Sequence, residues 1–177
     1  MDRPERNIFL IGPMGSGKTS IGQRLADLFE MEFLDCDHEL EDHTGASVSL
    51  IFDVEGEEGF RDRETRMLEK LSARQGVLIA TGGGVILRER NRELLRQRGL
   101  VVYLSTPVSW QLRRLSRDKS RPLLQTPDRE EKLMRLAEER NPLYAELADI
   151  EFPARNKSLD AVARELAGLI RAQLEKK

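Results

Sequence analysis

Short runs of apolar residues recur along the chain and alternate with stretches in which apolar residues return every three to four positions. Most of the short runs are continuously apolar and do not alternate with polar residues, which is typical of strands buried on both faces. Strands of this kind, separated by helices, indicate a parallel sheet covered on both sides. The predicted strands are residues 8–11, 31–36, 77–80, 100–104 and 150–153.

The stretches between these runs predict helices. Residues 38–75 have a helical pattern with breaks near Gly45, Gly56 and Gly59. The last predicted helix, 159–174, has one apolar side, made of Val162, Leu166, Leu169 and Ile170. Four other helices are predicted. One follows the first strand, one covers about 89–97, one begins near Pro107, and one runs from about 128 to 147.

A glycine-rich segment, Gly12-x4-Gly17-Lys18-Thr19, joins the first strand to the first helix. This is the pattern of a phosphate-binding loop, in which glycines aim successive backbone N–H groups at phosphate oxygens beside a helix N-terminus. The motif predicts that Lys18 reaches the β- and γ-phosphates and that Thr19 holds Mg²⁺. An ordinary strand–turn–helix corner is the alternative, but it does not require this spacing. The predicted nucleotide contacts are Gly15, Ser16, Gly17, Lys18, Thr19 and Ser20.

Two other segments end predicted strands and should lie beside this loop, because ligands of parallel sheets bind at the carboxyl ends of the strands. Asp35-Cys36-Asp37 ends the second strand. In an extended segment its two carboxylates share one side, where one could hold a metal ion and the other could deprotonate a hydroxyl. The alternative is that Asp37 caps the next helix. Gly82-Gly83-Gly84 ends the third strand. These glycines could let a ligand come close to the backbone, or they could form a flexible turn.

Arginines supply the remaining candidate chemistry. Residues 113–121 contain four arginines and one lysine against one aspartate, which is typical either of a solvated helix face or of a lid that carries an arginine to the γ-phosphate. Arg61 and Arg140 could each capture a carboxylate with two hydrogen bonds. The alternative is that each arginine forms an ion pair at the surface, Arg61 with Asp62 and Arg140 with Glu139.

Composition limits the class of protein. The 177 residues suit one domain. A net charge of −2 gives no support to nucleic-acid binding, and no apolar run reaches the length of a membrane span. Cys36 is the only cysteine, so no internal disulfide can form and a reducing cytoplasm fits. The charged start, MDRPERN, is not expected to be a signal peptide.

A regulatory GTP switch is the alternative from another class, since it also begins with this loop. Asp53-Val-Glu-Gly56 matches its D-x-x-G pattern by letters, but lies in a predicted helix rather than after a strand. The segment from Asn156 to Asp160 misses N-K-x-D by one residue. An adenylate-kinase-type or gluconate-kinase-type enzyme fits the sequence better than a GTP switch does.

Taken in order and spacing, the motifs resemble the shikimate kinases along essentially the whole chain. The resemblance implies an α/β fold of the P-loop NTPase class, a nucleoside-monophosphate-kinase-like three-layer sandwich whose five-stranded parallel sheet has the order 2-3-1-4-5. It implies a single domain over residues 1–177, a substrate-binding segment at about 35–64 and a lid at about 115–127. The matching segments are GPMGSGKTSIG (12–22), DCD (35–37), FDVEGEEGFRDRE (52–64), ATGGG (80–84), RDKSRPLL (117–124) and ERNPLY (139–144).

The resemblance also implies the reaction, which is transfer of the γ-phosphoryl group of ATP to the 3-hydroxyl of shikimate in the route to chorismate and aromatic amino acids. Asp37 would bind the substrate hydroxyls and act as the base. Arg61 and Arg140 would hold the carboxylate, and the backbone N–H of Gly83 would contact the substrate. Phe52 and Phe60 would pack near its ring.

On the donor side, the resemblance implies that Thr19 ligates Mg²⁺ directly and Asp35 through water. Lys18 and Arg121, the lid arginine, would act on the phosphates during catalysis, while Arg114 and Lys157 would contact the nucleotide. A cytoplasmic monomer is expected, with ATP and shikimate as its partners and with no nucleic acid or membrane.

Overall fold

A computed structural model describes residues 3–116 and 127–176 of the chain. Its five strands form one parallel sheet with the order β2-β3-β1-β4-β5, so the predicted strand order is confirmed. Each lies within one or two residues of its predicted place. The strands are β1 (Asn7–Ile11), β2 (Glu32–Asp35), β3 (Val77–Ala80), β4 (Gly99–Ser105) and β5 (Ile150–Pro153).

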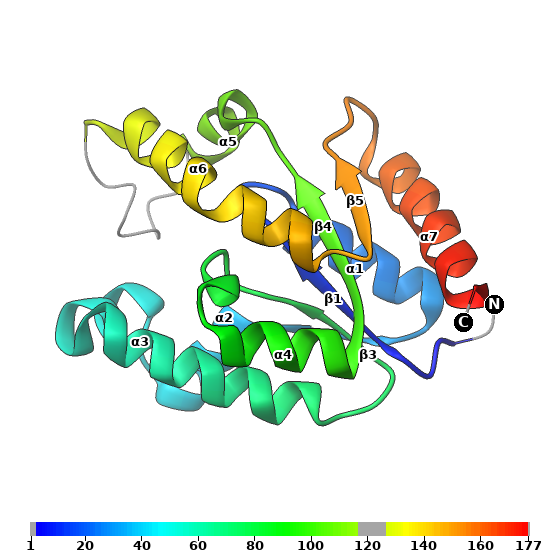
Figure 1. The fold of residues 1–177 in the computed structure, drawn as a ribbon, viewed down its shortest axis with the longest axis horizontal. Helices are drawn as coiled ribbons and strands as arrows, with labels where there is room; N and C mark the ends of the chain where they lie inside the picture. Colours follow the sequence, from blue (N-terminus) through cyan, green and yellow to red (C-terminus); the bar gives the residue numbers. More distant parts are fainter. Residues whose placement is uncertain (1–2, 117–126, 177) are drawn as a thin grey trace.

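Helices cover both faces of this sheet (Figure 1). Alternate strand residues point to opposite faces, which explains why Phe9 and Ile11 pack in one cluster and Ile8 and Leu10 in the other. The second face is covered by α1 (Lys18–Phe29) and α7 (Leu159–Glu175). The first is covered by α2 (Cys36–Thr44), α3 (Val48–Ser72), α4 (Glu89–Arg98) and α6 (Arg129–Leu147).

Glycines divide the long helical stretch after β2 as predicted at two positions of three. Gly45 has a left-handed φ of 72° and ends α2. Gly56 has φ 74° and kinks α3. Gly59 is helical, however, so the predicted break there is wrong. Ser47 starts α3 by accepting a hydrogen bond from the backbone N–H of Leu50, which is ordinary N-cap chemistry.

Two short elements complete the described part. A 3-10 turn, η1 (Val85–Leu87), follows the triple glycine, and α5 (Val108–Leu115) follows Pro107. The predicted apolar side of α7 is correct for Val162, Leu166 and Ile170, which are buried, but Leu169 is 44% exposed. Within residues 3–116 and 127–176, no helix is long and apolar enough to cross a membrane.

The loop after β1, the end of β2 and the triple glycine after β3 lie at one edge of the sheet, because paired residues run in register to that edge: Asp35 with Ala80, and Leu10 with Ala80. The predicted meeting of these three segments is therefore confirmed. Arg121 and nearly all of the predicted lid at 115–127 lie outside the described residues.

Candidate active site

The side chain of Lys18 is hydrogen-bonded to the backbone of the phosphate-binding loop. Its Nζ donates hydrogen bonds to the carbonyl oxygens of Gly12 and Pro13, at 2.7 and 2.9 Å. Gly17 immediately precedes α1 with φ 88°, a left-handed conformation that favours glycine. The backbone N–H groups at the start of α1 are therefore left to face an anion, as the motif requires.

Helix α5 holds the outer side of the loop through two side chains. Gln111 is buried and its Nε2 donates to the carbonyl oxygen of Met14 at 2.8 Å. Arg114 donates from Nη1 to the carbonyl oxygen of Gly15 at 2.9 Å. Gln111 could not be singled out from the sequence, because the loop that it supports lies 97 positions away.

A cavity of about 350 Å³ lies beside the loop and is lined in part by Arg114 and Lys157, the predicted nucleotide contacts. Lys157 is half exposed and lies 3.5 Å from a carboxylate oxygen of Glu165. The guanidinium of Arg155 lies 4.9 Å from the centre of the Phe152 ring, which faces the same cavity. Its other lining residues are Ser16, Gly17, Ser20, Ile21, Leu104, Ser105, Ala154, Leu159 and Val162.

The two predicted metal-site residues contact each other. The Thr19 hydroxyl donates to Asp35 Oδ2 at 2.8 Å. Asp35 Oδ1 accepts from the backbone N–H groups of Asp37 and His38, at 3.0 and 3.2 Å, and so caps α2. A hydroxyl and a carboxylate at the edge of a phosphate loop are oxygen ligands of the kind that Mg²⁺ prefers, so these residues fit the ion.

The prediction that the carboxylates of Asp35 and Asp37 share one side of an extended segment is wrong. Because α2 begins at Cys36, the two aspartates do not lie on one extended segment. Asp35 is the residue that caps the helix, and Asp37 lies in its first turn, so the alternative in which Asp37 is the cap is also wrong.

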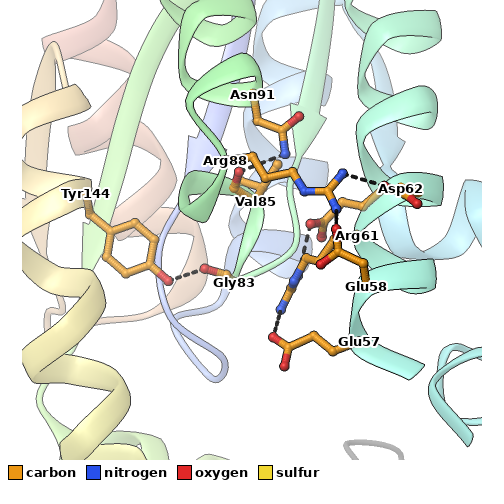
Figure 2. Close-up of polar contacts among 10 residues, drawn as sticks. Glu57, Glu58, Arg61, Asp62, Gly83, Val85, Arg88, Asn91 and Tyr144 are labelled. Atoms are coloured by element: carbon orange, nitrogen blue, oxygen red, sulfur yellow. Dashed lines mark hydrogen bonds and ion pairs between the residues drawn. The ribbon is translucent and has the colours of Figure 1, made fainter.

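Asp37, Arg61, Gly83 and Arg140 come from four separate elements and line one pocket (Figure 2 labels two of them). The stacked rings of Phe52 and Phe60, with centres 4.4 Å apart, line it as well. A cleft of about 300 Å³, which contains Lys18, Thr19 and Asp35, shares Asp37 and Gly83 with this pocket. The phosphate loop and the pocket are thus two ends of one continuous site.

Arg61 is buried, with only 7% of its surface exposed, so it is not a surface ion pair with Asp62. Its Nη1 donates to Glu64 Oε1 at 2.9 Å and its Nη2 lies 3.6 Å from Glu57. Asp62 contacts Arg88 at 2.8 Å (Figure 2). Among the described residues, Nε of Arg61 has no partner. A buried guanidinium with a spare donor is suited to capturing an anion.

Glu64 is a buried carboxylate that the sequence reasoning did not assign. Burial raises its pKa, and the carboxylate of Asp37 raises it further, while Arg61 opposes the shift. Its Oε2 has no partner in the described part of the chain. The spacing of these two residues could have indicated their contact, because residues three apart on a helix share a face and Glu64 follows Arg61 at that spacing.

The triple glycine makes room for these side chains. A Cβ on Gly84 would lie 2.3 Å from Nη2 of Arg61, and one on Gly82 would lie 2.8 Å from Glu64 Oε2. The following turn is fixed by Asn91, which is fully buried and donates to the carbonyl oxygen of Val85 at 2.9 Å (Figure 2). The glycines at 82 and 84 are therefore needed for the close approach of side chains.

Arg140 on α6 is also buried, with 6% of its surface exposed. A Cβ on Gly83 would lie 3.6 Å from its Nη1. The ion pairs of the described residues do not include one between Arg140 and Glu139, and Nε of Arg140 has no partner there. Tyr144, on the next turn of α6, donates from its hydroxyl to the carbonyl oxygen of Gly83 (Figure 2).

The segment from Asp53 to Gly56 lies inside α3. A switch loop that senses a γ-phosphate follows a strand at the edge of the sheet. The letter match to a GTP switch therefore has no structural counterpart.

Known proteins of one family match this arrangement. The family model described as "Shikimate kinase" matches residues 14–171. Shikimate kinases from Vibrio parahaemolyticus and Pasteurella multocida are each 52% identical, over 94% of this chain and 96% and 95% of theirs. A solved shikimate kinase from Acinetobacter baumannii, in complex with shikimate, is 49% identical with a TM-score of 0.93, and the match covers 96% of this chain and 95% of that one.

A second solved shikimate kinase, from Aquifex aeolicus, is 35% identical with a TM-score of 0.80 and matches 96% of both chains. The similarity therefore holds in sequence and in structure, and extends over nearly the full length of each relative. The chain belongs to the shikimate kinase family.

Proposed function

We propose that the chain transfers the γ-phosphoryl group of ATP to the 3-hydroxyl of shikimate, giving 3-phosphoshikimate and ADP in the route to chorismate and the aromatic amino acids. Family membership makes the protein an ATP-dependent shikimate kinase. The observation that carries the assignment of residues is one pocket, continuous with the phosphate loop, in which two buried arginines and an aspartate surround a glycine backbone.

The donor half of the site consists of the phosphate loop and α5. Gly15, Ser16, Gly17 and Ser20 bind phosphate oxygens through their backbone, and Lys18 pairs with the transferred group. Arg114 and Lys157 contact the nucleotide in the adjoining cavity. Gln111 keeps the loop in place from outside.

Thr19 and Asp35 are the residues that would hold Mg²⁺, Thr19 through its hydroxyl and Asp35 through water. Their mutual hydrogen bond supports this assignment, since it brings both oxygen groups to the mouth of the phosphate loop. An ion held by these residues would supply positive charge to neutralise the charge that develops on the β- and γ-phosphates.

The acceptor half recognises a small anion with several hydroxyls. Arg61 and Arg140 supply charged donors for its carboxylate, because each is buried and each has an Nε without a partner in the described part of the chain. The backbone N–H of Gly83 binds a hydroxyl, and Phe52 and Phe60 cover the face of the ring.

Asp37 is the base. As the 3-oxygen of shikimate forms its bond to the γ-phosphorus, the hydroxyl proton passes to the Asp37 carboxylate and the bond between the γ-phosphorus and the oxygen of ADP breaks. Asp37 is suited to this role because it lines both the phosphate cleft and the acceptor pocket.

The proposal extends to the organisation of the chain. Residues 1–177 act as one domain, with a substrate-binding segment at about 35–64 and a lid at about 115–127 whose Arg121 reaches the phosphates and helps exclude water. The enzyme acts as a cytoplasmic monomer without nucleic acid or membrane. Its single buried cysteine, Cys36, suits a reducing compartment.

Identifying the product tests the function directly. The chain is incubated with ATP, Mg²⁺ and shikimate, and the product is analysed by ³¹P NMR. We expect a phosphate monoester coupled to the proton on carbon 3. An ester on another hydroxyl, or release of inorganic phosphate alone, would contradict the proposal.

A further inference from the structure

The hydroxyl of Tyr144 lies between two parts of the acceptor pocket. It donates a hydrogen bond to the carbonyl oxygen of Gly83, and Figure 2 shows the side chain extending from α6 to that carbonyl. The positive charge of Arg140 also acts on this hydroxyl and opposes the rise of its pKa that burial causes. Tyr144 and Arg140 are four residues apart on α6, so they share one face of the helix.

The chemistry of the Tyr144 hydroxyl suits a position near both a carbonyl oxygen and a guanidinium. A tyrosine hydroxyl has one proton to give and lone pairs to accept with, whereas a guanidinium only donates. The hydroxyl gives its proton to the carbonyl oxygen of Gly83, and its lone pairs remain available to the guanidinium of Arg140. Burial raises the pKa of Tyr144 despite the opposing charge of Arg140, so the phenol keeps the proton that it donates.

The ring of Tyr144 is anchored in the core. The residue is fully buried, and its ring centre lies 5.0 Å from that of Tyr103 on β4. The position of the hydroxyl is therefore set by packing against the sheet. Gly83, in contrast, has glycine on both sides, and glycine has the freest backbone of any residue. The carbonyl of Gly83 shares one planar peptide unit with the N–H of Gly84. An anchor on this carbonyl therefore holds that unit in place and limits the rotation about the Gly83 backbone bonds through which the Gly83 N–H could turn away.

We propose that Tyr144 is a positioning residue, which holds the Gly83 backbone in the place beside the Arg140 guanidinium that binds shikimate. This inference rests on the proposed roles of Gly83 and Arg140. It assigns Tyr144 to the acceptor half alone, since the donor half is supported separately by Gln111 and Arg114. Loss of the hydroxyl should therefore weaken shikimate binding and leave ATP binding unchanged.

The test compares Tyr144→Phe with Tyr103→Phe. Both variants remove one hydroxyl from the same pair of rings and keep the packing. For Tyr144→Phe we expect the KM for shikimate to rise about three- to tenfold, the worth of one hydrogen bond, while the KM for ATP changes less than about twofold. For Tyr103→Phe we expect both values to stay within about twofold of wild type.

Two results would overturn the proposal. One is a KM for shikimate that does not change in Tyr144→Phe. The other is a parallel change in both KM values and in melting temperature in the two variants, which would mean that the ring pair only stabilises the fold. If wild type itself does not phosphorylate shikimate, the proposed function fails. If wild type is active and Tyr144→Phe equals it, only the role of Tyr144 fails.

A second measurement needs no stable Tyr144 variant. The chain has only two tyrosines, so labelling with 3-fluorotyrosine gives two ¹⁹F signals, which Tyr103→Phe assigns. Adding shikimate should shift the Tyr144 signal more than the Tyr103 signal. A Tyr144 signal that does not respond to saturating shikimate would also overturn the proposal.

Discussion

The guanidinium of Arg61 lies directly against the backbone of Gly84, so close that a methyl group on Gly84 would lie 2.3 Å from Nη2 and 2.6 Å from Nη1. No carbon atom tolerates either distance. The third glycine of the run after β3 is therefore needed by a side chain on α3, and this contact joins the substrate-binding segment to the edge of the sheet.

Gly84→Ala should displace Arg61 and lower kcat/KM for shikimate by about 10²-fold, since a shift of about 1 Å in a positioning group can have that effect. Binding of ATP, measured by calorimetry, should remain near the wild-type value. Gly168→Ala is the matched control, because Gly168 lies in α7 with no atom within 4 Å of an added Cβ. It should leave activity unchanged and raise stability by about 0.5–1 kcal/mol. Equal activity of both variants would refute the role of Gly84.

Asp35→Asn tests the metal assignment. Asparagine caps a helix about as well as aspartate does, so α2 should persist and the melting temperature should change little. The charge beside Thr19 is lost, and we expect the Mg²⁺ concentration for half-maximal activity to rise about 10- to 100-fold, as for other residues that act on a metal indirectly. An unchanged Mg²⁺ dependence would remove Asp35 from the site.

Asp37→Asn should lower kcat by about 10²- to 10⁴-fold, the usual contribution of a general base. ATP binding, followed by calorimetry in the presence of Mg²⁺, should be preserved because the phosphate loop is untouched. Asp37 does not cap α2, so a fall in stability is not expected to explain the loss. Wild-type turnover in this variant would show that another group accepts the proton.

The buried carboxylate of Glu64 predicts a pH dependence of stability. Burial raises its pKa above the ordinary value of 4.5, so the folded chain keeps this proton to higher pH than the unfolded chain does. The free energy of unfolding should therefore fall as pH rises from about 4.5 through the raised pKa. Glu64→Gln cannot titrate, so wild type should lose stability relative to this variant over that range.

Urea unfolding of both proteins at several pH values between 4 and 8 measures this difference. A stability difference that is independent of pH, or one that changes in the opposite direction, would mean that the charge on Arg61 outweighs burial at this site.

The sequence was sufficient for the sheet and for its functional edge. Continuous apolar strands and the loop from Gly12 to Thr19 require a parallel sheet with its ligands at one rim, and the observed order agrees. The start of α2 was not predictable, because Asp35 and Asp37 are equally good caps. In the structure, Asp35 Oδ1 accepts the capping hydrogen bonds, while its Oδ2 accepts from Thr19, a contact with a different element that the local sequence does not show.

Burial was the other property that local sequence did not reveal. Arg61 has Asp62, Arg63 and Glu64 beside it, and adjacent letters favoured an ion pair with Asp62. The helix instead directs residue 64 to the same side as residue 61 and turns residue 62 toward Arg88. Tyr144 stood in a recognised segment, but its contact with Gly83 spans 61 positions and depends on how α6 crosses the sheet.

The most direct test of the account is which acceptor receives the phosphoryl group. ADP release is coupled to NADH oxidation, with ATP and Mg²⁺ held constant and shikimate, gluconate or AMP supplied in turn to wild type, Arg61→Ala and Arg140→Ala. We expect turnover with shikimate alone, and in both variants a large rise in KM for shikimate. Turnover with gluconate or AMP but not with shikimate would contradict it.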